Sequence, residues 1–149
     1  MPAPTNDRRE IDKQLSFALY GAANRMIRMH KPLLEPLGLT FPQYLVMVEL
    51  LGNSPRTVGD LGARVGMDTG TITPLLKRLE KSGYVTRRRD VQDERKVMVE
   101  LTPAGMALQG GVAAVPGQIQ SACQITDDQA DEIRETLETM GRSANLAED

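Results

Sequence analysis

D-T-G-T-I-T-P-L-L-K-R-L-E-K-S-G is the sequence of residues 68–83. Its apolar residues recur at steps of three and four, which places them on one face of an α-helix: Ile72, Leu75, Leu76 and Leu79. The opposite face is small and hydroxylic near its start and cationic near its end: Gly70, Thr73, Pro74, Lys77, Arg78 and Lys81. The pattern is typical of an amphipathic surface helix, and it also suits a helix that lies in a DNA major groove.

The segments before this helix favour the second interpretation. Residues 40–43 have capping-box spacing and begin a helix that should stop at residues 52–53 and bury Leu45, Val46, Val48 and Leu50. Residues 57–60 repeat the spacing and begin a short helix that should end at Gly66. A short helix, a tight turn and a second amphipathic helix make a helix-turn-helix. Pro74 lies too deep for a first-turn proline, so we expect the first turn of the second helix to be distorted.

The segment after the helix predicts a β-hairpin. Residues 84–89 are rich in strand-forming side chains, residues 90–96 are polar, and residues 97–101 alternate with Val97, Val99 and Leu101 facing inward. The hairpin carries a cluster of cations: Arg87, Arg88, Arg89, Arg95 and Lys96. These charges are compatible with a solvated hairpin and with a wing that contacts phosphates and a minor groove. Their position behind a helix-turn-helix favours the wing.

Two helical regions flank this lobe, and a loose arm is expected at residues 1–7. Residues 8–31 form a helix that is apolar on more than one side and ends at Pro32 and Pro36, so it needs a second partner, for which another subunit is the first candidate. A helix that begins at Thr102-Pro103 is weakened by glycines and should bend or break near Pro116. The last helix begins with a capping box at residues 126–129, frays at residues 143–149, and carries a seam suited to pairing between chains: Ala130, Ile133, Leu137, Met140 and Ala144.

Composition narrows the class of protein. The net charge of the 149 residues is −2, yet residues 77–96 hold eight Lys and Arg against four Asp and Glu. A cationic segment in an acidic chain is typical of a DNA-binding protein that does not bind every polyanion. One cysteine, Cys123, excludes an intrachain disulfide, and no long apolar segment or signal core is visible, so we expect a cytoplasmic protein without a membrane span. No motif for an enzyme, a metal or another cofactor is visible.

Several phrases together resemble the MarR family of winged-helix repressors, and the most similar branch is OhrR, the organic-hydroperoxide sensors. They are F-A-L-Y at 17–20, K-P-L-L at 31–34, P-L-G-L-T at 36–40, P-Q-Y-L at 42–45, D-T-G-T-I-T-P-L-L-K-R-L-E at 68–80, D-E-R at 93–95 and L-T-P-A-G at 101–105. The resemblance implies a mainly α fold with a small β-wing. It implies one domain over residues 1–149, with a DNA-binding lobe at about 40–101 and dimerisation helices at about 8–38 and 103–147.

The resemblance also implies a homodimer that binds a pseudo-palindromic double-stranded operator. Its recognition helices would enter successive major grooves, and its wings would reach the flanking minor grooves. The residues that match the family's DNA contacts are Thr69, Gly70, Thr71, Thr73, Pro74, Lys77, Arg78, Arg87, Arg89, Asp93 and Arg95. Arg95 is then the minor-groove residue, Asp93 orients it, and Arg87 and Arg89 hold the DNA backbone.

The resemblance fails at the peroxide sensor. The OhrR branch oxidises a first-helix cysteine where this chain has Ser16, and the two tyrosines that contact that thiol are replaced by His30 and Phe41. A serine hydroxyl cannot replace the thiolate, which is the group that peroxide oxidises. Cys123 lies where some members keep a resolving thiol, and it is also explained as a small apolar residue near a helix break.

Two ways of regulation remain open. In the first, a homodimeric repressor is released by a small aromatic or lipophilic ligand bound near Ser16, His30, Phe41 and Tyr44. His30 would anchor a carboxylate, or it is simply a partly exposed residue at a helix end. In the second, the chain is a redox-responsive regulator of organic peroxide stress that acts through Cys123.

Overall fold

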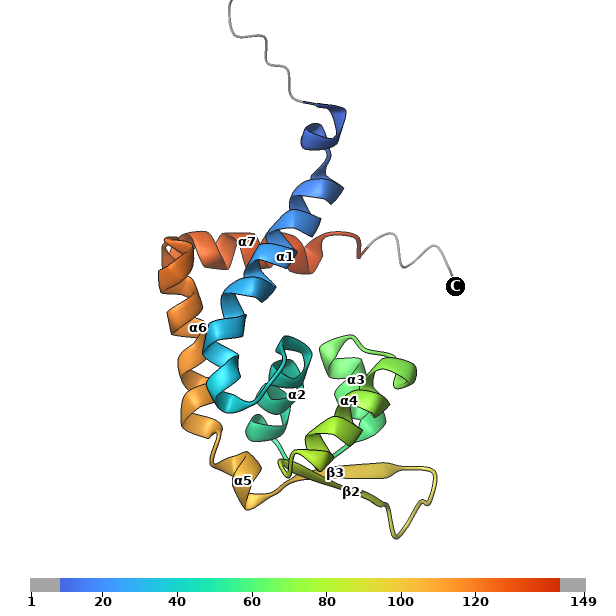
Figure 1. Cartoon of the computed structure of the whole chain (residues 1–149). Helices are drawn as coiled ribbons and strands as arrows, with labels where there is room; N and C mark the ends of the chain where they lie inside the picture. Colours follow the sequence, from blue (N-terminus) through green and yellow to red (C-terminus); the bar gives the residue numbers. More distant parts are fainter. Residues whose placement is uncertain (1–8, 143–149) are drawn as a thin grey trace, which may run out of the picture. The chain divides into compact units, whose positions relative to one another are not determined.

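The structure is a computed structural model that describes residues 9–142 (Figure 1). The arm predicted at residues 1–7, the frayed end predicted at 143–149 and the seam residue Ala144 lie outside the described part. The chain divides into two compact units between Ala113 and Ala114. The elements are η1 (Glu10–Lys13), α1 (Leu15–Leu34), η2 (Glu35–Leu37), α2 (Phe41–Gly52), β1 (Arg56–Thr57), α3 (Val58–Val65), α4 (Thr69–Lys81), β2 (Val85–Arg89), β3 (Val97–Leu101), α5 (Pro103–Met106), α6 (Gln109–Cys123) and α7 (Asp127–Thr139).

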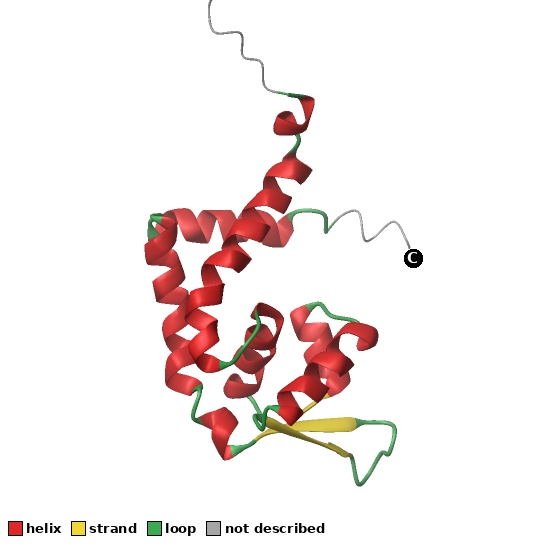
Figure 2. Cartoon of the chain, in the orientation of Figure 1, coloured by secondary structure: helices red, strands yellow, loops and turns green. Residues whose placement is uncertain are grey.

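Three short strands form an antiparallel sheet in the order β1-β3-β2 (Figure 2). Arg87 of β2 and Arg56 of β1 both pair with Val99, one on each side of β3. The two-residue strand β1 is too short for its sequence pattern to predict it. The mainly α fold with a small β-wing and a helix-turn-helix is confirmed. Among residues 9–142, no helix combines the length and the apolar character that crossing a bilayer requires.

The core between residues 41 and 101 consists of aliphatic side chains from α2, α3, α4 and the sheet. Its fully buried members are Val46, Met47, Leu50, Leu61, Ile72, Leu76, Leu79, Val85 and Val99. All four residues of the predicted α4 stripe are buried, which confirms that part of the pattern. In α2 the predicted set is partly wrong, because Val48 is exposed whereas Tyr44 and Met47 are buried. Positions 43, 46, 47 and 50 follow the helical period, and position 48 falls on the other side.

The helix starts are fixed by the caps that the sequence predicts. The Thr40 hydroxyl accepts a hydrogen bond from the Gln43 amide, and the Gln43 side chain accepts one from the Thr40 amide. Thr57 and Asp68 cap α3 and α4 by accepting from the backbone N–H three residues on. Such caps satisfy amides that have no partner inside the helix, and each contributes about 1 kcal/mol.

Both predicted boundaries of the first helix are wrong. Gln14 has an extended backbone, so the first helical region is divided into η1 and α1. Pro32 lies inside α1 and does not end it, because a proline in the last turn removes only one helical hydrogen bond. The helix runs on to Leu34, and Gly38 ends the following turn in the left-handed conformation (φ 69°).

The helix after the wing breaks earlier than predicted. The break lies at residues 107–108, and α6 continues through Pro116 to Cys123. Thr102 holds α5 against the base of the wing: its hydroxyl donates to the Gly83 carbonyl (2.5 Å) and its amide to the Tyr84 carbonyl (3.0 Å). α5 follows this attachment, and the break at residues 107–108 separates it from α6.

Pro74 lies inside α4, which nevertheless begins at Thr69 as the Asp68 cap requires. The Asp68 carbonyl accepts from the amides of both Thr71 (3.1 Å) and Ile72 (2.9 Å), so the first turn carries a tighter hydrogen bond than an α-helix needs. Pro74 supplies no N–H to the carbonyl of Gly70. Shared hydrogen bonds of this kind are common at helix ends, so the first turn shows no distortion that Pro74 must explain.

Gly105 is required by a close backbone approach and gives a stability test. A Cβ at this position would collide with the Tyr84 carbonyl oxygen. We therefore expect Gly105→Ala to destabilise the fold by about 1–3 kcal/mol in urea unfolding, because the wing base and α5 must separate. Gly110→Ala is the matched control: no atom lies within 4 Å of its Cβ position in α6, so it should stabilise by about 0.5–1 kcal/mol. Equal effects of the two substitutions would contradict the assignment.

Candidate nucleic-acid interface

The exposed face of α4 carries the residues that the sequence predicts for base and phosphate contact. Ile72, Leu75, Leu76 and Leu79 are buried and turn the opposite face of the helix outward. Thr73 is half-buried, and the other predicted residues of this helix are exposed: Thr69, Gly70, Thr71, Pro74, Lys77 and Arg78. Short hydroxyl donors thus precede cations along one accessible helix face.

A hollow of about 430 Å³ lies between the first turns of α3 and α4 and the wing. Its lining combines hydroxyl groups with three cations: Thr57, Val58, Gly59, Thr69, Thr73, Arg87, Arg95, Lys96 and Val97. The structure therefore brings the recognition helix and the wing tip to one surface. Hydroxyls, helix-start amides and cations together suit the phosphate oxygens of a nucleic acid.

The wing tip presents one arginine in a fixed orientation. The Asp93 carboxylate accepts hydrogen bonds from the Arg95 side chain (Nε, 3.1 Å) and from its amide (3.1 Å). The Arg95 side chain nevertheless remains 92% exposed. Arg89 donates to the Glu94 carbonyl (2.8 Å), which closes the loop from the other side. Asp93 thus holds Arg95 by two hydrogen bonds, and its role in orienting Arg95 toward a minor groove stays a prediction.

Arg87 differs from the expectation that it is available to hold the DNA backbone. Its guanidinium donates through Nε (3.3 Å) and an NH2 group (3.2 Å) to one carboxylate oxygen of Glu80, at the end of α4. Its amide donates to the other oxygen (2.9 Å). The Arg87 side chain is only 22% exposed. The hairpin sequence gives no sign of this pair, because Glu80 belongs to the preceding helix.

A second ion-pair group joins α2 and β1 to α3, the first helix of the helix-turn-helix. Arg56 contacts Glu49 of α2 (2.5 Å) and Asp60 of α3 (2.8 Å), and Arg64 donates to Glu49 (3.3 Å). Hydrogen bonds to Asp60 and then to Glu49 raise the pKa of Arg56. The Arg56 side chain is largely buried, so these contacts fix the spacing of α2 and α3. They also escape sequence analysis, since the three elements are brought together only by folding.

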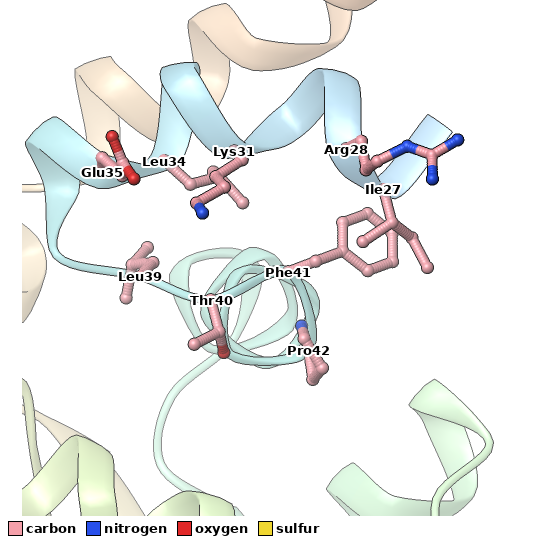
Figure 3. Close-up of a pocket in the computed structure, with 9 residues that line it drawn as sticks. All are labelled: Ile27, Arg28, Lys31, Leu34, Glu35, Leu39, Thr40, Phe41 and Pro42. Atoms are coloured by element: carbon pink, nitrogen blue, oxygen red, sulfur yellow. The ribbon is translucent and has the colours of Figure 1, made fainter. Parts of the chain in front are cut away.

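The residues predicted for a ligand do not form one site in a single chain. A cavity of about 410 Å³ between α1 and the start of α2 is lined by Ile27, Arg28, Lys31, Leu34, Glu35, Leu39, Thr40, Phe41 and Pro42 (Figure 3). Of the predicted set it includes only Phe41. The lining joins apolar side chains with two cations and one carboxylate, which suits a lipophilic ligand that carries charge.

The rings of His30 and Tyr44 lie next to Phe41, which lines this cavity. The rings of His30 and Phe41 meet edge to face with centroids 4.8 Å apart, and Tyr44 lies 5.7 Å from His30. His30 Nδ1 donates to the Met26 carbonyl (2.7 Å), and His30 is buried, so the reading as a partly exposed helix-end residue is wrong. Burial raises the pKa of the Tyr44 phenol. The three rings form a packed cluster that supports the cavity wall.

Ser16 and Cys123, the two positions linked to peroxide sensing by the family resemblance, do not line this cavity. Ser16 is exposed in the first turn of α1, and along the helix axis it stands roughly 21 Å from His30 at 1.5 Å per residue. Cys123 is the last residue of α6, in the other compact unit, and is partly accessible as a free thiol.

The Asp93–Arg95 contact predicts a measurable titration. Hydrogen bonds from the Arg95 side chain, and then from its amide, hold the pKa of Asp93 below its ordinary value of 3.8. Because the folded pKa is depressed, the contact is complete above the ordinary value and is lost as the pH falls through the folded value. We expect carboxyl NMR to give a pKa below 3.8 that rises in Arg95→Ala. A wild-type value at or above 3.8 would show that the tip is not oriented in this way.

Comparison with known proteins places this geometry in a family. The family model of the SarA/Rot transcriptional regulators matches residues 28–109. The organic hydroperoxide resistance transcriptional regulator of Bacillus subtilis is 35% identical over 134 residues, which cover 90% of this chain and 91% of the relative. A crystal structure of overoxidized AbfR bound to DNA, a protein of Staphylococcus epidermidis, is 31% identical with a TM-score of 0.75 and covers 88% of this chain and 92% of that one.

Wild-type MarR from E. coli in its apo form shares the fold as well. It is 25% identical with a TM-score of 0.66, and the match covers 84% of this chain and 95% of that one. The family model spans more than half of the chain, and the Bacillus relative spans nine-tenths of it. The chain therefore belongs to the MarR family of winged-helix transcriptional regulators, which here includes the SarA/Rot type.

Proposed function

We propose that this regulator is a homodimeric repressor that binds a pseudo-palindromic DNA operator and is released by a small lipophilic anion. The observation that carries the proposal is the hollow that joins the start of α4 to the wing. It gathers hydroxyls of Thr69 and Thr73 with the cations of Arg95 and Lys96 on one accessible surface. Overoxidized AbfR, a relative of similar fold, is bound to DNA in its crystal structure.

Each DNA contact follows from position on this surface. The hydroxyls and small residues at the start of α4 face base edges and nearby phosphates, because they occupy the exposed face of its first turns. Lys77 and Arg78 follow along the same helix toward the backbone. Arg95 enters the flanking minor groove, held by Asp93, while Arg89 supports the loop.

The dimer is proposed from apolar side chains that each unit leaves exposed. On α1 and the segment before it these are Ile11, Leu15, Phe17, Tyr20, Met26 and Ile27, and on α7 and directly after it they are Ile133, Leu137 and Met140. Large apolar side chains exposed repeatedly along one helix support an association site, because their exposure to water is unfavourable. A second copy also supplies the second recognition helix that half-sites about 34–36 Å apart require.

The cavity beside Phe41 supports release by a ligand. Its apolar walls would take the hydrocarbon part of a ligand, and Arg28 and Lys31 would take a carboxylate. α2, which forms one wall, packs against the helix-turn-helix, so an occupied cavity is mechanically connected to the DNA-binding surface. The ligand therefore has a route by which to change the position of the recognition helix.

The wing assignment predicts a change in salt dependence. A duplex is first selected from a random pool with the wild-type protein, and binding is then measured by anisotropy between 50 and 200 mM salt. We expect Arg95→Ala to weaken binding and to lower the slope of log K against log salt by about 0.9, the amount for one phosphate contact. Arg134→Ala removes a cation of α7 that is paired with Asp131 and should leave the slope unchanged. An unaltered slope in Arg95→Ala would contradict the wing assignment.

The cavity assignment predicts loss of an anionic probe. With 2-naphthoate in calorimetry, we expect Arg28→Gln combined with Lys31→Gln to weaken binding by roughly tenfold or more, the value of one charge-assisted hydrogen bond. Arg25→Gln is the control, since Arg25 lies on the same helix outside the cavity lining.

Two outcomes would overturn release by a ligand. One is naphthoate binding that is unaffected by both cavity substitutions. The other is release from DNA by cumene hydroperoxide that Cys123→Ser abolishes, which would establish redox regulation in its place.

A further inference from the structure

Strand β2 forms one edge of the sheet, so some of its amides have no partner strand. One of them belongs to Arg87, and it donates to Glu80 of α4 (2.9 Å). The same carboxylate receives two hydrogen bonds from the Arg87 guanidinium. The Glu80 side chain therefore accepts the hydrogen bond of an unpaired edge amide and joins the wing to the last turn of the recognition helix.

The Glu80 contact also changes what Arg87 can do. Arg87 lines the hollow of the DNA-binding surface, yet its side chain is 22% exposed, against 56% for Arg88 and 92% for Arg95. Its charge is balanced by a carboxylate at hydrogen-bond distance. Two of its five N–H groups are engaged by Glu80, and the carboxylate offsets its charge, so its attraction for a phosphate is weaker than that of an unpaired arginine.

Resting on the proposed DNA binding, we propose that Glu80 is a positioning residue that determines specificity. It withholds the Arg87 guanidinium from the DNA backbone and fixes the wing on α4, so that the exposed Arg95 and Lys96 deliver the charge of the wing tip. Phosphate contacts are independent of sequence. Withholding one of them lowers binding to unrelated DNA, while a preset wing lowers the ordering cost at the operator.

The charge state of Glu80 supports this role. The hydrogen bond from the Arg87 amide, followed by those from its guanidinium, holds the pKa of Glu80 below its usual range. The carboxylate is therefore ionised throughout the pH range in which DNA binding is measured.

The test compares three variants on two duplexes. One duplex is selected from a random pool with the wild-type protein, and the other is its scrambled sequence. Glu80→Gln keeps the size of the side chain and removes its charge, and Glu80→Gln with Arg87→Gln removes the pair without changing net charge. Glu100→Gln is the matched control. Glu100 of β3 pairs with Arg88 of the neighbouring strand β2, and its loss changes the net charge of the protein by the same amount as Glu80→Gln. Circular dichroism and thermal unfolding establish that each variant is folded.

Glu80→Gln should release Arg87 to a phosphate. We expect the salt slope to rise by about 0.9 on both duplexes. On the scrambled duplex the released contact should raise the affinity several-fold. On the selected duplex the loss of the preset wing should offset this gain, so that the ratio of selected to scrambled binding falls several-fold. In the double variant the slope should return to the wild-type value. Glu100→Gln should change the slope by less than half as much.

Two results would overturn the inference. One is a wild-type slope in Glu80→Gln. The other is a slope about 0.9 below wild type in the double variant, which would mean that Arg87 already touches a phosphate. The double variant decides the matter alone if the single one does not fold. A wild-type protein that selects no duplex would instead overturn the proposed function, and the inference with it.

Discussion

The DNA-binding surface depends on the one-sided burial of α4. Ile72, Leu75, Leu76 and Leu79 are all buried, and each contributes about 1.5–3 kcal/mol when it is removed from water. This anchoring is strong enough to hold a helix whose outer face has little intrinsic helix preference, with Gly70 and Pro74 among its residues. Because the apolar stripe holds the helix in place, the residues of the opposite face are not needed for stability and can contact a partner.

Polar contacts then set the angles between elements that the core alone does not define. Arg56 joins α2 to α3 through Glu49 and Asp60, and Arg87 joins the wing to α4 through Glu80. In both groups an arginine binds a carboxylate of a neighbouring helix, and its planar fork fixes direction as well as distance. Cations that remain exposed, such as Arg95, are thus separated from those used to build the lobe.

The sequence predicts the elements that have a periodic or capping signal. The α4 stripe, the caps at Thr40 and Thr57 and the hairpin all belong to this class, because each depends on residues close together in the chain. Prediction fails where tertiary contact decides: Pro32 and Pro116 are tolerated inside helices, and β1 exists only because β3 pairs with it. The candidate site divides in the same way, since the exposed residues of α4 follow from the helical period whereas the Glu80–Arg87 pair does not.

In the proposed complex, two copies of α4 and the wing bind one face of duplex DNA. Hydroxyl-radical footprinting of the wild-type protein on its selected duplex tests this most directly. We expect two protected backbone segments one helical turn apart, flanked on both sides by protected minor grooves at the wing positions. A single protected segment, or no protection even at low ionic strength, would contradict it.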